Sequence, residues 1–243
     1  MSTEPPVYVY GVVGADAPAP EGTGIDRQLL RLVAADGLGA IVSDVPGAAP
    51  TFGREALMAH SDVLKGALAT ATVLPMRFGV IMDGDGAVRD ELLEPHHDQL
   101  VDQLERLDGC VELTLRATYE EAPLLREILA TEPEIRAMHA GNRGSYLEQV
   151  RLGELIAAAV DTRRRRDTDE IIARLAPLAT DYQLGELRHE RAALSASFLV
   201  PREGIEAFDA AVDGVGRNNR HRMRLRYTGP LPPHSFVNLE RAS

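Results

Sequence analysis

The sequence predicts an α+β protein made of two ferredoxin-like (split βαβ) modules that are joined by long helices. Each half of the chain has two strand patterns of alternating apolar residues with a helical pattern between them. The segments are residues 73–82, 95–107 and 111–119 in the first half and residues 194–200, 205–212 and 222–227 in the second. A long amphipathic pattern over residues 145–165 lies between the two sets, so we expect a helical connection.

The first predicted element group is a βαβ unit. Residues 7–13 are rich in valine and tyrosine and predict a strand, and residues 15–24 read as a loop of proline, glycine and alanine. Apolar residues at helical spacing predict a helix over residues 25–35. A short apolar run at residues 39–45 then predicts the second strand of this unit.

The next elements complete the first module. Residues 53–70 predict a helix, and residues 73–82 predict one strand with a continuous apolar face. Residues 95–107 carry an apolar stripe at helical spacing, which predicts a helix. Residues 111–119 alternate between apolar and polar, so we expect a strand with one buried face and one wet face, with Glu112 on the wet face.

The second half is expected to hold a separate domain. A long helix is predicted from Ser145 to about residue 165, and Asp167 has the character of a capping residue that starts or restarts a helix. We place an N-terminal α+β domain at residues 1–121 and a C-terminal α+β domain at residues 122–243. The latter is expected to have long helices, a small antiparallel sheet and a proline-rich tail.

Composition excludes several classes of protein. The chain has 243 residues and a formal charge of −11, which argues against a nucleic-acid-binding protein because such proteins need clustered cations. No apolar run is long enough to span a membrane, and the first residues lack the pattern of an export signal. Cys110 is the only cysteine, so an internal disulfide is excluded, and a cytoplasmic location is expected.

No motif in the sequence predicts a catalytic residue, a cofactor or a metal. The glycines of residues 11–24 do not match a dinucleotide-binding motif, and residues 83–94 resemble a calcium loop only at its ends, so a turn is expected after Met82. His96 and His97 are adjacent, and side chains about 100° apart on a helix do not readily share one ion. His97 lies four residues after Leu93 and three before Leu100, so we interpret it as a partly buried packing residue.

Arginines form the remaining candidate sites. Residues 163–166 are four arginines at the predicted end of a helix, where they suit either a solvated terminus or an anionic partner. Arg222, Arg224 and Arg226 alternate on one predicted strand, and they are either paired within the chain or exposed to a partner. Arg77 is either paired beneath a helix or part of a recognition surface.

Residues 228–237 read Thr-Gly-Pro-Leu-Pro-Pro-His-Ser-Phe-Val, a rigid segment that can be neither helix nor central strand. This tail resembles the Gly-Pro-Trp-Pro-Pro-Tyr-Ser-Phe ending of the gas vesicle protein F/L family, with Leu231 in place of tryptophan and His234 in place of tyrosine. Further segments resemble the same family in chain order, namely residues 73–79, 109–115, 149–154 and 196–200.

The resemblance implies a non-enzymatic accessory protein of gas vesicle assembly, located in the cytoplasm or at the vesicle. Its expected partners are the small hydrophobic shell protein and other accessory proteins of the vesicle. Leu231 and Phe236 of the tail, together with Arg77 and the arginines of the last strand, are the candidate partner-binding residues. Two alternatives stay open, which are a regulatory module that binds a small ligand on its ferredoxin-like sheets and, more weakly, an unrecognised hydrolase.

Overall fold

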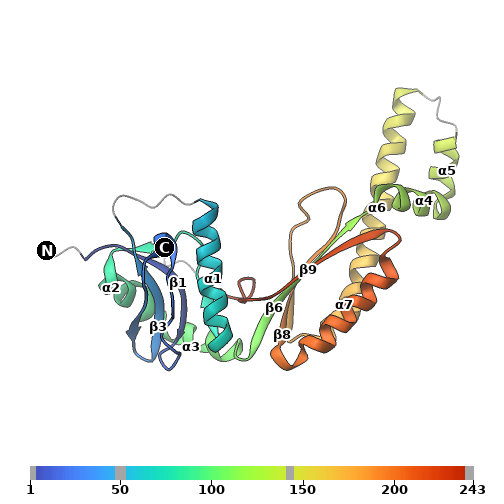
Figure 1. Ribbon diagram of the computed structural model, residues 1–243. Helices are drawn as coiled ribbons and strands as arrows, with labels where there is room; N and C mark the ends of the chain where they lie inside the picture. Colours follow the sequence, from blue (N-terminus) through green and yellow to red (C-terminus); the bar gives the residue numbers. More distant parts are fainter. Residues whose placement is uncertain (1–3, 47–52, 141–144, 239–243) are drawn as a thin grey trace. The chain divides into compact units, whose positions relative to one another are not determined.

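The structure has the α+β architecture that the sequence predicts, with two antiparallel sheets in two units of the chain (Figure 1). This computed structural model describes three stretches of the chain, which are residues 4–46, 53–140 and 145–238. The first unit contains residues 1–112 and 230–243, and the second contains residues 113–229. The tail thus groups with the first unit, whereas the sequence assigned it to a C-terminal domain. The boundary of independent folding at residue 121 stays a prediction.

The first sheet has the order β2-β3-β1-β4, and β5 also pairs with β1. Its strands are β1 (Val7–Gly14), β2 (Leu30–Ala35), β3 (Leu38–Asp44), β4 (Val73–Pro75) and β5 (Ile81–Met82). Every described pairing in this sheet is antiparallel. Since β1 is buried along nearly its whole length, it forms the centre of the sheet.

The prediction of a βαβ unit in this region is wrong, because β2 and β3 form a hairpin. Only Ile25–Arg27 is helical, as a short 3₁₀ turn, and Asp26 within it has a positive φ of 52°. The hairpin turns at Asp36 and Gly37, whose φ angles are 45° and 81°. An Asp-Gly pair with two positive φ angles matches the twist of antiparallel strands, so the turn favours a strand over the expected helix.

The predicted strand over residues 73–82 is interrupted, and the first predicted module is wrong. β4 ends at Pro75, Gly79 has a φ of 96°, and the chain rejoins β1 only at β5. Pro75 and Gly79 both disfavour a continuous ladder. In addition, β4 and the next long strand, β6 (Cys110–Tyr119), belong to different sheets.

Helices cover the first sheet. α1 (Arg54–Thr70) and α3 (His97–Arg106) both pack against β1 and β4. Where the sequence predicts a turn after Met82, the chain forms α2 (Gly84–Ala87) and a π-helical segment, Val88–Leu93. The helices predicted over residues 53–70 and 95–107 are therefore confirmed, and the expected turn between strand and helix is wrong.

The second sheet has the order β7-β8-β6-β9. It contains β7 (Asp181–Leu184), β8 (Ala192–Pro201) and β9 (Met223–Leu231) beside β6. α7 (Ile205–Asn219) connects β8 to β9, which lie on either side of β6. This is the strand order of a split βαβ connection, although the ferredoxin-like classification of this second module stays a prediction.

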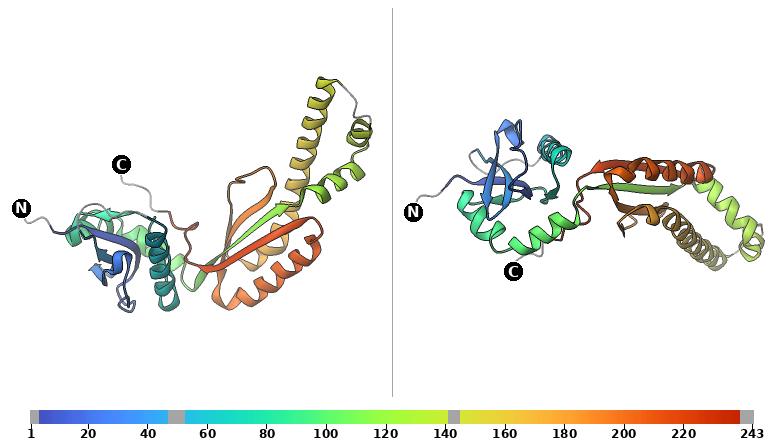
Figure 2. Two further views of the ribbon diagram at one scale, coloured as in Figure 1. Left: turned by 45° about the horizontal axis from the view of Figure 1, so that its top comes forward. Right: turned by 90° about the horizontal axis from the view of Figure 1, so that it is seen from below.

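The remaining helices are α4 (Glu121–Thr131), α5 (Pro133–Ala140) and α6 (Tyr146–Leu175). α6 and α7 contact each other and both pack on β8, whereas α4, α5 and the first half of α6 project beyond the sheet (Figures 1 and 2). Ser145 and Glu148 form a capping box at the start of α6, as the long-helix prediction requires. The expected restart at Asp167 is wrong, since α6 is continuous over 30 residues.

An aromatic cluster in the first unit encloses His60. The side chain is 3% exposed, and its Nδ1 lies 3.0 Å from the hydroxyl oxygen of Tyr8. The rings of Tyr10 and Phe78 lie 5.7 Å and 5.6 Å away between centroids. Burial, with the nearby His234, lowers the pKa of His60 from 6.5 to about 4. The unfolded chain therefore binds a proton between pH 6.5 and 4 that the folded chain does not.

We predict that His60 makes the fold sensitive to acid. Because the unfolded state takes up the extra proton, the free energy of unfolding should fall by about 2 kcal/mol between pH 7 and pH 5 through this group. The free energy of unfolding of His60→Gln, measured with denaturant at both pH values, should fall by about 2 kcal/mol less than that of the wild type. His97→Gln is the control, since the bonds of His97 to Asp98 and to the Asp36 carbonyl raise its pKa instead. Equal losses in wild type and His60→Gln would contradict the prediction.

Candidate functional site

The proline-rich tail is bound to the first unit through its backbone. Ser235 donates from its backbone N–H and its hydroxyl to the two carboxylate oxygens of Glu112, at 2.8 Å and 2.7 Å. Arg106 donates to the carbonyl oxygen of Phe236 at 2.6 Å. Gln103 exchanges hydrogen bonds with the backbone of Asn238 at 2.7 Å and 3.2 Å. These contacts hold the tail in a defined path.

The apolar residues of the tail are therefore not equally available to a partner. Phe236 is 3% exposed, whereas Leu231 is half-buried at the end of β9. Glu112, which anchors the tail, is buried, although the sequence placed it on the wet face of its strand. A carboxylate that interrupts the apolar run of residues 110–113 was the available signal, because a buried charge requires donors nearby.

Arg222 lies inside a network of side chains in the second unit. Its guanidinium binds both carboxylate oxygens of Asp167, with one of the two bonds measuring 2.9 Å, and donates to Asn219 at 2.7 Å. Tyr119 donates its hydroxyl to Asp167 at 2.6 Å, and burial together with this bond raises the Tyr119 pKa. Glu127 lies 3.7 Å from the Arg222 Nε. Arg222 thus has the intramolecular pairing that the sequence left as one alternative.

The other candidate arginines lie closer to solvent. Arg224 is exposed and forms an ion pair with Glu120, and Arg226 and Arg77 are exposed as well. The structure therefore does not bring Arg222 onto one surface with Arg224 and Arg226. A role for the exposed arginines in partner binding stays a prediction.

The four arginines of residues 163–166 lie within α6 and not at its end, so this expectation is wrong. Arg163 pairs with Glu127 at 3.1 Å, and Arg164 donates to the carbonyl oxygens of Glu190 and Ala192 at 2.7 Å and 2.8 Å. Arg166 lies 3.3 Å from Glu170 one turn further along the helix. These partners belong to the chain itself.

His97 and Cys110, whose side chains could be reactive, have defined positions in the fold. His97 bonds Asp98 through Nδ1 and the carbonyl oxygen of Asp36 through Nε2, both at 2.9 Å. Cys110 is buried at the start of β6. Within residues 4–46, 53–140 and 145–238, no group of three His, Cys, Asp or Glu side chains could hold a metal ion. None of the helices in these stretches combines the length and apolar character of a membrane span.

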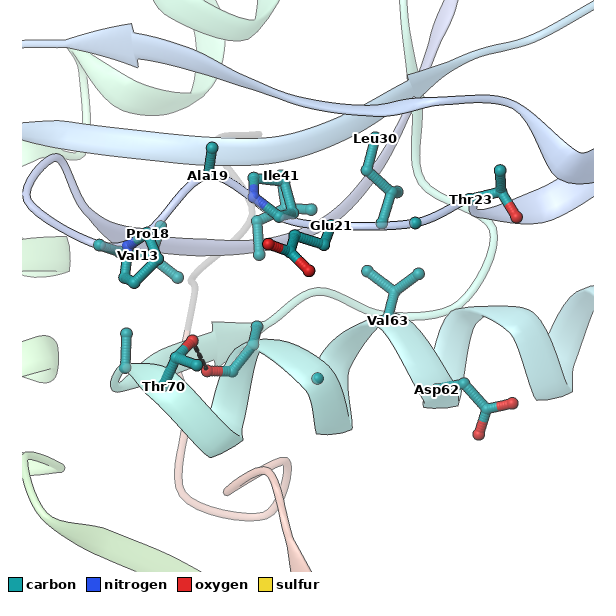
Figure 3. Close-up of a pocket in the computed structure, with 16 residues that line it drawn as sticks. Val13, Pro18, Ala19, Glu21, Thr23, Leu30, Ile41, Asp62, Val63 and Thr70 are labelled. Carbon is teal, nitrogen blue, oxygen red and sulfur yellow. Dashed lines mark hydrogen bonds between the residues drawn. The ribbon is translucent and has the colours of Figure 1, made fainter.

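An apolar hollow of about 550 Å³ lies in the first unit between α1 and the sheet. The loop of residues 17–23 forms one wall, and the apolar lining comes from strands and helix together, through Val13, Leu30, Ile41, Val63 and Ala67. Figure 3 shows Val63 pointing from α1 toward Leu30 and Ile41, whereas Asp62 points away from them. Such a concave apolar surface can bind an apolar segment of another molecule.

Sequence reasoning missed this hollow, because it depends on the hairpin at residues 30–44. In the structure, Leu30 lines the hollow from the strand β2, which pairs with β3. The expected helix over residues 25–35 would remove this strand, and with it the sheet beside the loop of residues 17–23. No local signal in the sequence identifies the hollow, since its lining residues come from four separate elements and a loop.

The chain is similar to known proteins over nearly its whole length. A family model described as gas vesicle synthesis protein GvpL/GvpF matches residues 6–238. Gas vesicle protein F of Streptomyces sp. (strain CB03234) is 39% identical over 240 residues, covering 95% of this chain and 98% of that protein. Gas vesicle protein L of the same strain is 31% identical over 270 residues, covering 98% of this chain and 95% of that protein.

A solved structure has the same fold. The crystal structure of the gas vesicle protein GvpF from Anabaena sp. PCC7120 superposes with a TM-score of 0.89 and covers 98% of this chain and 100% of that chain. The two sequences are 24% identical, so this likeness concerns the fold. The shared fold includes the two antiparallel sheets and the helices described above.

We predict that Asp167→Ala strongly destabilises the second unit. The substitution leaves Arg222 buried without its main counter-charge, which typically costs about 3 to 5 kcal/mol. Glu170→Ala on the same helix is the matched control, because its pair with Arg166 is exposed and should contribute less than about 1 kcal/mol. Denaturant unfolding of both variants measures the difference. Similar stabilities for the two variants would show that the buried pair is not a major source of stability.

A second prediction concerns the tail. Phe236→Ala empties a buried aromatic site and should lower the free energy of unfolding by about 3 to 5 kcal/mol, if the tail mainly caps its own unit. Leu231→Ala, at a half-buried position of the same segment, should cost less. Thermal unfolding and co-purification with the shell protein are to be measured together. A Phe236→Ala protein with unchanged melting and no bound shell protein would place the interface on the tail itself.

Proposed function

Because the chain belongs to the gas vesicle synthesis GvpL/GvpF family, we propose that it is a non-enzymatic accessory protein of vesicle assembly that binds the small hydrophobic shell protein. It acts as an assembly factor in the cytoplasm or at the vesicle, where other accessory proteins are further partners. The observation that carries this proposal is the family match over residues 6–238.

The physical need for such a protein follows from the shell. A wall that keeps water out of a gas space requires a strongly apolar surface on its subunit, and that surface associates without control in water. A soluble acidic partner can cover the apolar surface until the subunit joins the wall, or it can help to nucleate the wall. The net charge of −11 of this chain would keep such a complex soluble.

The apolar hollow beside α1 is the surface that we assign to this contact. It offers the half-buried apolar side chains of Leu30 on β2 and Ala67 on α1, with Val13, Ile41 and Val63 buried in its lining. Phe236 is buried against its own unit and Arg222 is buried in its own network, so neither is suited to form this contact. Of the predicted partner-binding residues, Arg77, Arg224 and Arg226 are exposed and Leu231 is half-buried, so these four remain proposals.

We predict that Gly66→Trp blocks co-purification with the shell protein. Gly66 lines the hollow, and a Cβ at this position meets no atom within 4 Å, so a large side chain can be added beside the hollow from open space. Gly153→Trp is the matched control, since Gly153 is also a glycine within a helix with open space at its Cβ. The shell protein should co-purify with wild type and with Gly153→Trp. Retention of the shell protein by a folded Gly66→Trp protein would exclude the hollow as the contact surface.

The proposed non-enzymatic role gives a separate prediction. His96→Ala, His97→Ala and Cys110→Ser should each still support vesicle formation in cells, because a binding protein needs none of these side chains as a reactive group. Vesicles can be counted by electron microscopy, with immunoblots to establish that the variant is abundant. Loss of vesicles with a folded and abundant variant would favour an enzyme instead.

A further inference from the structure

A second hollow adjoins the apolar one. Its volume is about 690 Å³, and both hollows are lined by Ala17, Pro18, Thr70 and Ala71. We call the two together the α1 groove, because α1 forms part of both walls. The groove therefore continues from the apolar lining past the C-terminal end of α1 toward α3.

The second hollow is acidic. Three carboxylates line it, those of Asp16, Glu105 and Asp108. The apolar hollow adds two more, those of Glu21 and Asp62. Among the described residues, no lysine, arginine or histidine lines either part. The α1 groove thus joins an apolar surface to a concentrated negative charge.

Most of these carboxylates have no cation beside them. Asp62 lies 3.9 Å from Lys65, and Asp108 accepts a hydrogen bond of 2.6 Å from Thr72. For Asp16, Glu21 and Glu105, no ion pair within 4.0 Å occurs in the described part of the chain. A concave surface with one sign of charge attracts the opposite charge and disfavours partners of the same sign.

We propose that the α1 groove binds an extended or helical peptide segment in which an apolar stretch is followed by lysine or arginine. The apolar residues lie against Pro20, Leu30 and Ala67, which keep part of their surface exposed, and the basic residue lies beside Asp16 and Glu105. The acidic part thereby sets which apolar segment is bound and in which direction. This inference rests on the proposed function, since it names the chemistry of the partner segment at the same site.

Three synthetic peptides test the charge preference directly. Each has the same short stretch of leucine, valine and alanine, and they end in two arginines, two glutamines or two glutamates. Fluorescence anisotropy with the full chain should show the arginine peptide binding about threefold to tenfold more tightly than the glutamine peptide at low ionic strength. The preference should shrink as salt is raised, because exposed pairs are screened.

Variants assign the preference to the groove. Asp16→Asn combined with Glu105→Gln should remove the preference and leave the binding of the glutamine peptide unchanged. Glu206→Gln combined with Asp213→Asn is the control, because it removes the same charge from exposed positions on α7. Gly66→Trp should weaken the binding of the arginine and glutamine peptides alike.

The outcomes separate this inference from the proposed function. The inference is overturned if the arginine and glutamine peptides bind equally well, or if the preference survives in the Asp16 and Glu105 variant. In either case, co-purification with the shell protein still supports the proposed function. Peptide binding with the expected preference but no co-purification overturns the function alone. If Gly66→Trp changes self-association in light scattering and not peptide binding, the groove is an interface between copies of this chain and the inference fails.

Discussion

The carboxylate of Asp167 is the point on which the second unit depends. It accepts hydrogen bonds from Arg222 just before β9 and from Tyr119 at the end of β6, while its own backbone belongs to α6. Arg163 on the same helix adds a contact of 3.4 Å. A charge buried to this extent is costly unless it is paired, so the helix and the two strands must meet in one arrangement for the fold to be stable. The long helix is thereby fixed to the sheet at a buried charge, and Arg164 and Thr168 of the same helix add hydrogen bonds to the Ala192 and Ala193 carbonyl oxygens of β8.

Segments whose local chemistry agrees with their final structure could be predicted from the sequence. The alternation of β8 specifies that strand within a few residues, and the amphipathic pattern from residue 145 specifies where α6 begins. The failures have physical causes that periodicity does not contain. The Asp36–Gly37 turn outweighs the helical spacing of residues 25–35, and pairing with two separate stretches of β1 breaks residues 73–82 into two short strands. In both cases a tertiary partner decides the structure of a segment with mixed preferences.

The candidate site could be predicted only in part. The rigid tail was visible in the sequence, since three prolines in four residues restrict the backbone, but its docking on Glu112 was not. Arginine alternation near residue 224 indicated a basic surface, yet Arg222 turns inward because Asp167 lies opposite it in the fold. The apolar hollow needs residues from four elements at once, and no local pattern marks such a surface. Binding surfaces that are built from several elements are thus the part of function that sequence patterns describe least.

The docking of the tail also sets an order in which the protein can be made. Ser235 and Glu112 are separated by 123 residues, and the whole second unit lies between them in the chain. During synthesis on a ribosome, the first unit therefore emerges early but closes only after Ser235 and Phe236 have left the exit tunnel, since contacts of such separation form late. A chain that stops within the second unit lacks the tail residues that contact its first unit. The first unit is therefore complete only after the whole second unit and the tail have been translated.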